Sequence, residues 1–439
     1  MRLGVVADDL TGSNDIGIMF AKAGYLTEIY TFDPQNEAST RRMAGSQAAV
    51  MIVNTNARLL PAEQAYQRAF LATQMLKQLG CHQFYNKTCS VLRGPVGAYF
   101  DGMLDALAQN FALVIAGFPK NHRLTIHGIH YVGGLPLAES EFRDDPIHPM
   151  LRSNLVDILQ GQTKRQVARV DCDVIRQGVD AVAAAIAGVR HNCNYLVMDV
   201  PDQGALRTIA QAAVGEPVFC GSSGLAEELA HIWGVQPHQQ NGMCPPGSKG
   251  GGILVASGSL MPQSRAQIAW LKTQGIPVIE FDPVAILDET RLPVAVAQAV
   301  DRLALLVNAG RDVVFCMPNH PEIVTQIQVT AQQQGIARVT LGNRVSQILA
   351  EIIEKVVACT SLDRLIVAGG ETSAAVCSRL GIFGFRLLQE IEPGLPSCQA
   401  LSGREMILVL KSGSFGSPEF FGKAIQTLRK DEGKIVHRV

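Results

Sequence analysis

Two adjacent aspartates follow the first apolar segment of the chain and could take part in proton transfer. Residues 3–7 have the composition of a buried strand, and residues 8–15, Asp-Asp-Leu-Thr-Gly-Ser-Asn-Asp, follow directly. A carboxylate there can orient a substrate hydroxyl or accept its proton as a general base. Capping of the next helix would explain one polar residue, but not two acids with a threonine and a serine. We therefore predict that Asp9 and Asp8 are catalytic residues, and the sequence leaves open which is the base.

A group of cations and hydroxyls occupies residues 86–95, Asn-Lys-Thr-Cys-Ser-Val-Leu-Arg-Gly-Pro. The proline suits the first turn of a helix, and basic and hydroxyl side chains at a helix start suit a carboxylate or phosphate. Arg58 is a further cation behind a strand-like run, residues 49–53. Single surface cations are usually only solvated, but their grouping at turns behind strands favours binding. The predicted substrate-binding residues are Asp9, Arg58, Lys87, Thr88, Cys89, Ser90 and Arg93.

Three turns rich in glycine and serine follow apolar segments in the C-terminal part of the chain. The segments are residues 252–255, 365–367 and 407–410, and each turn leads into a helix-like stretch. Such turns expose consecutive backbone N–H groups at a helix N-terminus, where a phosphate can bind. Three of them favour a shared nucleotide pocket at one edge of a sheet. The predicted nucleotide-binding residues are Ser257, Gly258, Ser259, Gly369, Gly370, Glu371, Thr372 and Gly413, with Ser412 and Ser414 beside the last.

Other nucleotide motifs are missing from the sequence. There is no Gly-x-x-x-x-Gly-Lys-Ser/Thr, which excludes a P-loop, and no Gly-x-Gly-x-x-Gly opens either half, which weighs against a dehydrogenase. Protein-kinase signatures are also missing. Glu371 could reach Mg²⁺ directly or through water, because magnesium in phosphate sites keeps several waters. The sequence assigns no other metal ligand.

Metal-binding patterns are weak elsewhere. Residues 121–130 contain three histidines, but their spacing matches no standard ligand set. We predict a loop with structural or substrate-contacting histidines there. The ten cysteines are scattered without a Cys-x-x-Cys pair, which favours reduced, buried thiols over a zinc site and indicates a cytoplasmic protein.

Short β-branched segments alternate with longer amphipathic or alanine-rich segments in both halves of the chain. This pattern predicts an α/β fold with two doubly wound, mainly parallel-sheet domains. Ligands of such sheets bind at the carboxyl ends of strands, so we expect an interdomain active-site cleft. Residues 236–252 are dense in glycine and proline, without periodicity, and predict a linker between a substrate-binding domain, residues 1–235, and a nucleotide-binding domain, residues 253–439.

The remaining predicted strands are residues 112–116, 195–199, 217–220, 277–281 and 312–317. The predicted helices are residues 13–23, 62–79, 96–109, 180–189, 204–214, 262–273, 294–308 and 321–334. Each strand is short enough to cross a sheet once, and each helix is long enough to cover it, which is the spacing of repeated strand–helix units.

The composition restricts the partners of the protein. Its 38 basic and 39 acidic residues give a net charge of −1, which predicts no nucleic-acid partner. Two acids near the N-terminus interrupt the apolar core that a signal peptide would need. No apolar stretch approaches the roughly 20 residues that span a bilayer, so we expect no membrane contact.

The motifs together resemble those of the four-carbon acid sugar kinases. The matching segments occur in order over essentially the whole chain: Ala-Asp-Asp-Leu-Thr-Gly from Ala7, Ser-Val-Leu-Arg-Gly from Ser90, Gly-Ile-His-Tyr-Val from Gly128, Pro-Leu-Ala-Glu-Ser from Pro136, Gly-Ser-Ser-Gly from Gly221, Gly-Gly-Glu-Thr from Gly369 and Lys-Ser-Gly-Ser-Phe-Gly from Lys411. The resemblance implies phosphorylation of D-threonate, D-erythronate or 3-oxo-tetronate by ATP, with Mg²⁺, to the 4-phosphate. It also implies that the N-terminal domain binds the acid sugar and the C-terminal domain the nucleotide.

The resemblance assigns roles to individual residues. It implies that Asp9, Arg58, Lys87 and Ser90 contact the sugar acid, and that Ser257, the turn 369–372 and Gly413 contact ATP. Two departures lie on the substrate side: Cys89 stands where the family usually has aspartate, and the segment before Arg58 carries asparagine and alanine in place of aspartate and serine. D-Threonate is the predicted substrate, on the resemblance alone, and a homodimer is compatible with such an enzyme.

Two other classes of protein stay open at this level. A sugar-acid aldolase or dehydrogenase could use the same cations, but it would not need three phosphate-binding turns. A metabolite-binding protein on a kinase scaffold would bind sugar acids without consuming ATP. Sequence does not distinguish threonate from erythronate, because hydrogen-bond geometry in loops reads a single stereocentre.

Overall fold

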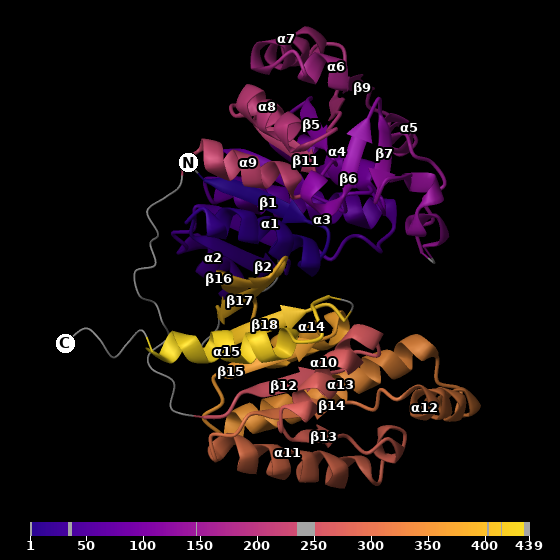
Figure 1. Ribbon diagram of the computed structural model, residues 1–439, viewed down its shortest axis with the longest axis vertical. Coiled ribbons are helices and arrows are strands. Elements are labelled where there is room, and N and C mark those ends of the chain that lie inside the picture. The colour runs from indigo at the N-terminus through magenta and orange to yellow at the C-terminus, as the bar shows by residue number, and fades with distance from the viewer. Residues whose placement is uncertain are drawn as a thin grey trace, which may run out of the picture. The chain divides into compact units, whose positions relative to one another are not determined.

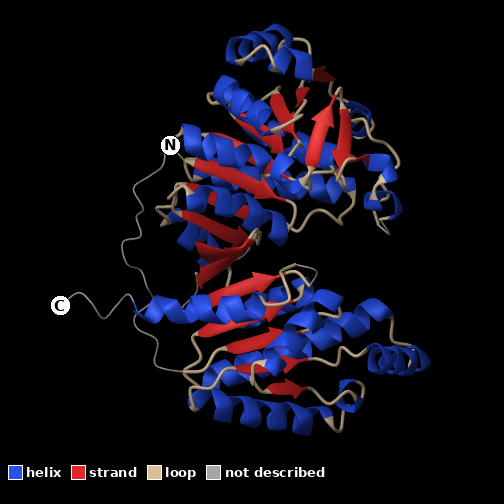
Figure 2. Ribbon diagram, viewed as in Figure 1, coloured by secondary structure: helices blue, strands red, loops and turns tan. Residues whose placement is uncertain are grey.

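The computed structural model describes residues 2–33, 37–145, 147–234, 251–401, 404–413 and 415–433. The chain divides into two compact units, Met1–Gln240 and Asn241–Val439. Both are built of helices packed on a sheet, which confirms the predicted α/β class (Figures 1 and 2). The predicted linker, residues 236–252, lies outside the described residues except for Gly251 and Gly252. Among the described residues no helix is long and apolar enough to cross a membrane.

The first unit contains an eight-stranded sheet in which every neighbouring pair of strands is parallel. Its spatial order is β2 (Thr27–Thr31), β3 (Val50–Asn54), β1 (Leu3–Ala7), β4 (Gln83–Lys87), β11 (Val218–Gly221), β5 (Ala112–Ile115), β10 (Tyr195–Met198) and β9 (Val167–Val170). The central strands are buried along their whole length, as expected of strands that helices cover on both faces. This explains their almost continuous apolar sequences.

Helices surround this sheet. They are α1 (Leu10–Lys22), α2 (Glu37–Ala44), α3 (Ala62–Gln78), α4 (Val96–Leu107), α5 (Leu155–Gln160), α6 (Cys172–Ile175), α7 (Val179–Val189), α8 (Gln203–Ala213) and α9 (Gly224–Ile232). The five helices predicted for this half correspond to α1, α3, α4, α7 and α8 within a few residues at each end. Strands β2, β4 and β9 are additions to the predicted set.

A small antiparallel sheet corrects the loop predicted for residues 121–130. Strands β6 (Arg123–Ile126), β7 (Ile129–Val132) and β8 (Leu135–Pro136) form it. The β6–β7 turn consists of His127 and Gly128, which both have positive φ, the conformation that a two-residue hairpin needs. The histidines interrupt the apolar alternation that would have indicated strands, which is why the pattern resembled a loop.

The second unit contains a seven-stranded sheet that is mainly parallel. Its order is β13 (Val278–Glu280), β14 (Val313–Cys316), β12 (Leu254–Ser257), β15 (Arg364–Ala368), β18 (Ile407–Lys411), β17 (Leu395–Ala400) and β16 (Gly384–Glu392). The first five strands are parallel, whereas β17 and β16 are antiparallel. This hairpin was not predicted, because β16 is only partly buried and its charged residues weaken the strand signal.

The helices of the second unit are α10 (Pro262–Thr273), α11 (Leu292–Asn308), α12 (Pro321–Gln333), α13 (Arg338–Cys359), α14 (Gly370–Arg379) and α15 (Phe420–Gly433). The predicted helices correspond to α10, α11 and α12, and α13 is an addition. An apolar cluster fills the space between the sheet, α10 and α15, with Val255, Ile366 and Val409 from the strands and Leu271 and Phe421 from the helices. This packing fixes the strand ends from which the three Gly/Ser turns start.

Candidate active site

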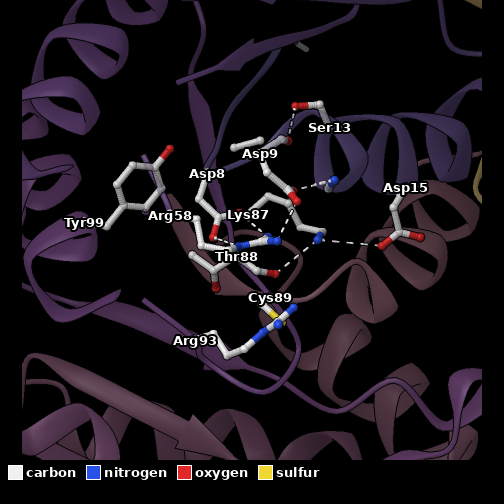
Figure 3. A network of polar contacts seen from close by, with 12 residues as sticks. Asp8, Asp9, Ser13, Asp15, Arg58, Lys87, Thr88, Cys89, Arg93 and Tyr99 are labelled. Atoms are coloured by element: carbon white, nitrogen blue, oxygen red, sulfur yellow. Dashed lines mark hydrogen bonds and ion pairs between the residues drawn. The ribbon is translucent and has the colours of Figure 1, made fainter. Parts of the chain in front are cut away.

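The carboxyl ends of three neighbouring strands bring the predicted substrate-side residues together. In the sheet register Ala7, the last residue of β1, pairs with Asn54 of β3 and with Lys87 of β4. Asp8 follows β1 immediately, and the chain beyond β3 returns to it, because the Arg58 amide donates to the Asp8 carbonyl at 3.2 Å. Residues far apart in sequence therefore meet at one edge of the sheet (Figure 3).

Asp9 caps helix α1 and also faces this edge. Its backbone is extended, and Oδ1 accepts a hydrogen bond from the Gly12 amide at 2.7 Å. A Cβ on Gly12 would lie only 2.6 Å from Asp9 Oδ1 and 3.1 Å from the Lys87 ammonium, so a side chain there would displace the Asp9 carboxylate. Capping and a binding role are thus compatible in one carboxylate, since its second oxygen is left for other partners.

Arg58 clamps both aspartates. Its Nε and Nη2 donate to the two carboxylate oxygens of Asp8 at 2.9 and 2.8 Å, and Nη1 donates to Asp9 Oδ2 at 2.5 Å (Figure 3). His148 Nε2 lies 3.1 Å from the Arg58 carbonyl oxygen and ties the backbone to a distant segment. The guanidinium keeps further N–H donors beyond these three, so it can orient the aspartates and still reach a ligand.

The two aspartates have different surroundings. The side chain of Asp8 is 4% exposed and that of Asp9 is 26% exposed. Burial raises the pKa of Asp8, and the neighbouring Arg58 charge opposes this effect. Burial alone would lower the pKa of Arg58, but the charges of the two aspartates outweigh it and raise that pKa, so the guanidinium stays charged. Asp9 is therefore the carboxylate that a substrate can reach, and Asp8 holds Arg58 in place.

Lys87 has few partners for a buried cation. It is 4% exposed, and its ammonium donates to the carbonyl oxygen of Thr88 at 3.1 Å. The Asp15 carboxylate lies 3.7 Å away and also accepts a hydrogen bond from the Ser223 hydroxyl. The Thr88 hydroxyl is buried and has no hydrogen-bond partner among the described residues. A cation and a hydroxyl are thus available to a polar ligand at this strand end.

The remaining substrate-side residues form a second group. Arg93 donates through Nη1 to Asp145 at 2.6 Å and through Nε to the Cys89 sulfur at 3.4 Å, and it lies over the Phe142 ring at 5.0 Å. The His148 amide and the Arg93 guanidinium lower the pKa of Asp145 to about 2. Arg93 is therefore held by an ion pair, while Cys89 and Ser90 are partly exposed beside it.

Three residues in this region were not predicted as site residues: Asp15, Asp145 and Ser223. Asp15 ends the Asp-Asp-Leu-Thr-Gly-Ser-Asn-Asp segment, and Ser223 belongs to the Gly-Ser-Ser-Gly turn, so both lie in motifs that the sequence displays. Their contact across the sheet follows from the pairing of Gly221 with Lys87, which only the fold provides. Asp145 has no such signal, because it follows a short 3-10 helix outside any motif.

The histidines of the β6–β7 hairpin have structural roles. His127, Cys172 and Asp199 offer ligand atoms within 4.8 Å of one another. However, the Asp199 carboxylate already accepts the backbone N–H groups of His127, Gly128 and Cys172 at 2.6, 2.9 and 3.0 Å. It therefore anchors the hairpin turn to the sheet. His130 is buried against Thr125, and burial lowers the pKa of the His130 imidazole to about 3, so it is neutral.

The three Gly/Ser turns of the second unit lie side by side. In the sheet register Ser257 pairs with Ala368, and Ala368 pairs with Lys411, so three adjacent strands end at the same level. A Cβ on Gly258 would collide with the Thr372 hydroxyl. The turns thus touch, and small residues are required where they do.

Polar groups at these turns are left without partners. The hydroxyls of Ser257 and Ser373 are buried and have no hydrogen-bond partner among the described residues. Ser373 lies in the first turn of α14, whose N-cap, Gly369, has a φ of +119°. Glu371 in the same turn is exposed, and Thr372 is buried. Orphan hydroxyls beside the N-terminal amides of a helix suit a phosphate group.

The other predicted nucleotide contacts lie at the same edge. Ser259 accepts a hydrogen bond from the Met261 amide at 3.2 Å, and a Cβ on Gly413 would collide with the Ser259 hydroxyl. Gly370 begins α14. Ser414 lies outside the described residues. All the other predicted nucleotide-side residues therefore belong to one group of adjoining turns.

Two family models match the chain, one in each half. Residues 3–229 match a family model described as a sugar-binding N-terminal domain, and residues 254–421 match one described as a nucleotide-binding C-terminal domain. A 3-oxo-tetronate kinase of Cupriavidus necator is 32% identical over 97% of each chain. A D-threonate kinase of Salmonella typhimurium is 28% identical and covers 95% of this chain and 96% of its own.

Solved structures have the same fold. A Salmonella typhimurium LT2 protein with the provisional name of a tRNA synthase has a TM-score of 0.81 at 28% identity, over 96% of this chain and 98% of its own. A Haemophilus influenzae protein of family DUF1537 has a TM-score of 0.79 at 27% identity, over 97% and 100%. A sugar-binding and a nucleotide-binding domain together define an enzyme that acts on a sugar with a nucleotide. The chain belongs to the four-carbon acid sugar kinase family and is an ATP-dependent sugar-acid kinase.

Proposed function

We propose that this enzyme transfers the γ-phosphoryl group of ATP to the terminal hydroxyl of a four-carbon sugar acid in sugar-acid catabolism, with D-threonate, giving D-threonate 4-phosphate, as the predicted reaction. The observation that supports it most is the partly exposed Asp9 carboxylate, which Arg58 fixes beside the poorly partnered Lys87 ammonium. The Asp9 carboxylate can accept a hydrogen bond from a hydroxyl, and the Lys87 ammonium can bind a carboxylate. A cytoplasmic location and a homodimer stay predictions.

The substrate side explains how the acceptor would be oriented. The carboxylate of the sugar acid would bind the Lys87 ammonium and a remaining N–H of Arg58, and the Thr88 hydroxyl would donate a hydrogen bond to a substrate oxygen. Asp9 would accept a hydrogen bond from the terminal hydroxyl. As the bond from this oxygen to the γ-phosphorus forms and the bond from phosphorus to the β-phosphate oxygen breaks, the hydroxyl proton passes to Asp9 and ADP leaves.

The nucleotide side would hold the phosphates of ATP. The hydroxyls of Ser257 and Ser373 have no hydrogen-bond partner among the described residues, the first amides of a helix such as α14 have none within the helix, and the glycines leave room for a close approach. Mg²⁺ would neutralise charge on the phosphates, and the exposed Glu371 carboxylate is our candidate to hold it, directly or through water. Preorganised donors of this kind stabilise the charge that develops in the transition state.

A 3-oxo-tetronate is the second candidate acceptor. The Cupriavidus necator 3-oxo-tetronate kinase shares 32% identity with this chain, against 28% for the Salmonella typhimurium D-threonate kinase. The two acids differ by a carbonyl in place of a hydroxyl, so a site that hydrogen-bonds one leaves a polar group unpaired with the other. D-Erythronate differs from D-threonate only in one stereocentre and is the third candidate acceptor.

The test is a coupled measurement of ADP release by the purified protein with Mg²⁺ and ATP. The acceptors are D-threonate, L-threonate, D-erythronate, L-erythronate and the 3-oxo-tetronates, and ³¹P NMR identifies the phosphorylated carbon. We expect turnover with one acid and a 4-phosphate product. ATP-independent turnover of a sugar acid would instead support an aldolase or dehydrogenase. Binding of an acid without ADP release would support a binding protein.

A further inference from the structure

Lys411 is a buried lysine at the edge that carries the three turns. It is the last residue of β18 and is 2% exposed. Its carbonyl oxygen accepts the Gly369 amide at 2.9 Å, which places its backbone beside the N-cap of α14. Neither the predicted substrate contacts nor the predicted nucleotide contacts include it.

The Lys411 ammonium has only uncharged partners among the described residues. It donates to the Ser264 hydroxyl and to the Gly413 carbonyl, both at 3.2 Å, and it lies 5.5 Å from the centre of the Phe421 ring. No aspartate or glutamate of the described residues pairs with it, and burial lowers the pKa of its ammonium to about 8. Burial of a cation without a carboxylate is costly, so a negatively charged ligand would relieve a defect of the free protein.

Two other cations at strand ends, unlike Lys411, have carboxylate neighbours. Arg58 contacts two carboxylates, and Lys87 lies 3.7 Å from that of Asp15. Lys411 occupies an equivalent position at the end of a buried strand, yet it has no carboxylate neighbour in the described part of the chain. The described residues therefore supply no negative charge to this ammonium, and an anionic ligand could supply it.

The two hydrogen-bond partners place the ammonium at the phosphate-binding turns. Ser264 lies in the first turn of α10, the helix that follows the Ser257–Ser259 turn. Gly413 lies in the third turn, so tightly against Ser259 that a Cβ would collide with the Ser259 hydroxyl. The ammonium therefore connects the third turn to α10, the helix that follows the first turn, and an ammonium with two hydrogen bonds keeps a further donor.

We propose that Lys411 supplies the counter-charge for the phosphate chain of the nucleotide. This rests on the proposed function, because it takes the three turns to be the nucleotide site. On binding, a phosphate oxygen of the nucleotide accepts a hydrogen bond from the Lys411 ammonium. The rival explanation is that Lys411 only ties the 412–413 turn to α10.

The test compares ligands with and without a phosphate chain. Isothermal titration calorimetry of the full-length protein measures affinity for ADP and for adenosine, in the wild type and in Lys411→Met. We expect ADP binding to weaken by about 10- to 100-fold and adenosine binding to change by less than about twofold. The matched control is Lys355→Met, because Lys355 is 52% exposed and pairs with Glu351 on α13. It should leave both affinities unchanged.

The outcomes separate this inference from the proposed function. Failure of the wild type to bind ADP overturns the nucleotide site itself. Binding of ADP by the wild type and Lys411→Met with equal affinity, or equal weakening of ADP and adenosine, overturns the role of Lys411 and leaves the proposed function intact. Should Lys411→Met not fold, Lys411→Gln removes the charge while keeping a hydrogen-bond donor, and the same comparison applies.

Discussion

Arg58 Nη1 donates to Asp9 Oδ2 at 2.5 Å, while the other edge of the same guanidinium is bidentate to Asp8. Arg58 therefore fixes the partly exposed Asp9 carboxylate, and the buried Asp8 carboxylate in turn fixes Arg58. The base that we propose, held in this way, would need no rearrangement before it meets a hydroxyl, which is how preorganised sites lower a barrier.

The first prediction concerns the proposed base. Asp9→Asn keeps the cap of α1, because asparagine also caps helices, but it removes the proton acceptor. We expect turnover at saturating substrate to fall by about 10²- to 10⁴-fold while ADP affinity is unchanged. Asp202→Asn is the control, since Asp202 caps α8 in the same way, with Oδ1 accepting the Ala205 amide at 2.8 Å. Near-normal turnover of Asp9→Asn would show that Asp9 is not the base.

The second prediction concerns the stability of the aspartate pair. Arg58→Met leaves the buried Asp8 carboxylate without its cation, which should lower the free energy of unfolding by about 3–5 kcal/mol at pH 7. This destabilisation should be smaller at low pH, because burial raises the pKa of Asp8 in the fold and a protonated Asp8 tolerates burial without a cation. The stabilising effect of protonating Asp8 is lost as the pH rises through that pKa, so the destabilisation is then at its largest. Urea unfolding at pH 5 and pH 8 measures it. An equal loss at both values would contradict this account.

The third prediction concerns Lys87. Lys87→Met should raise KM for the sugar acid and lower kcat/KM by about 100-fold, because a charge-assisted hydrogen bond to the substrate carboxylate is lost. KM for ATP should stay the same. Lys120→Met is the control, since Lys120 is 55% exposed in an ion pair with Glu227. An unchanged KM for the acid would place its carboxylate elsewhere.

The fourth prediction concerns contact between the turns. Gly258→Ala places a methyl group against the Thr372 hydroxyl, so one of the two turns must move. We expect ADP affinity to fall by about tenfold or more, with a modest loss of stability of about 1–3 kcal/mol. Gly188→Ala in α7 is the control, because a Cβ there meets nothing within 4 Å. Calorimetry with ADP and thermal unfolding measure both effects.

The fifth prediction concerns the cost of Lys411 in the unliganded protein. Its pKa is about 8 in the fold against 10.5 for an ordinary lysine, so the unfolded chain binds more protons between these values. The contribution of Lys411 to the free energy of unfolding of the wild type should therefore rise as the pH goes from about 8 to about 10.5, by on the order of 3 kcal/mol in total. Below pH 8 the full penalty is present, and Lys411→Met should be more stable than the wild type there. Thermal unfolding without nucleotide checks this. A wild type whose stability does not rise between pH 8 and pH 10.5, or a Lys411→Met variant that is less stable than the wild type below pH 8, would contradict it.

The sequence by itself determined the elements and most of the polar residues at their ends. Buried parallel strands need unbroken apolar runs, and turns that bind phosphate need glycine and hydroxyls, so β1, β12, β15 and β18 and their turns could be predicted from local composition. The two-domain α/β class followed from the alternation of these elements. The family followed from the order of the motifs.

Only the tertiary structure decided how those residues pair. Arg58 was predicted as a cation for the substrate, and the fold shows that it first clamps Asp8 and Asp9, 50 and 49 residues away in sequence. The contact of Asp15 with Ser223 spans 208 residues and depends on strand order. That no carboxylate of the described segments pairs with Lys411 is likewise invisible in sequence. Strand order and register bring together side chains that no local pattern connects, and burial then sets their charge.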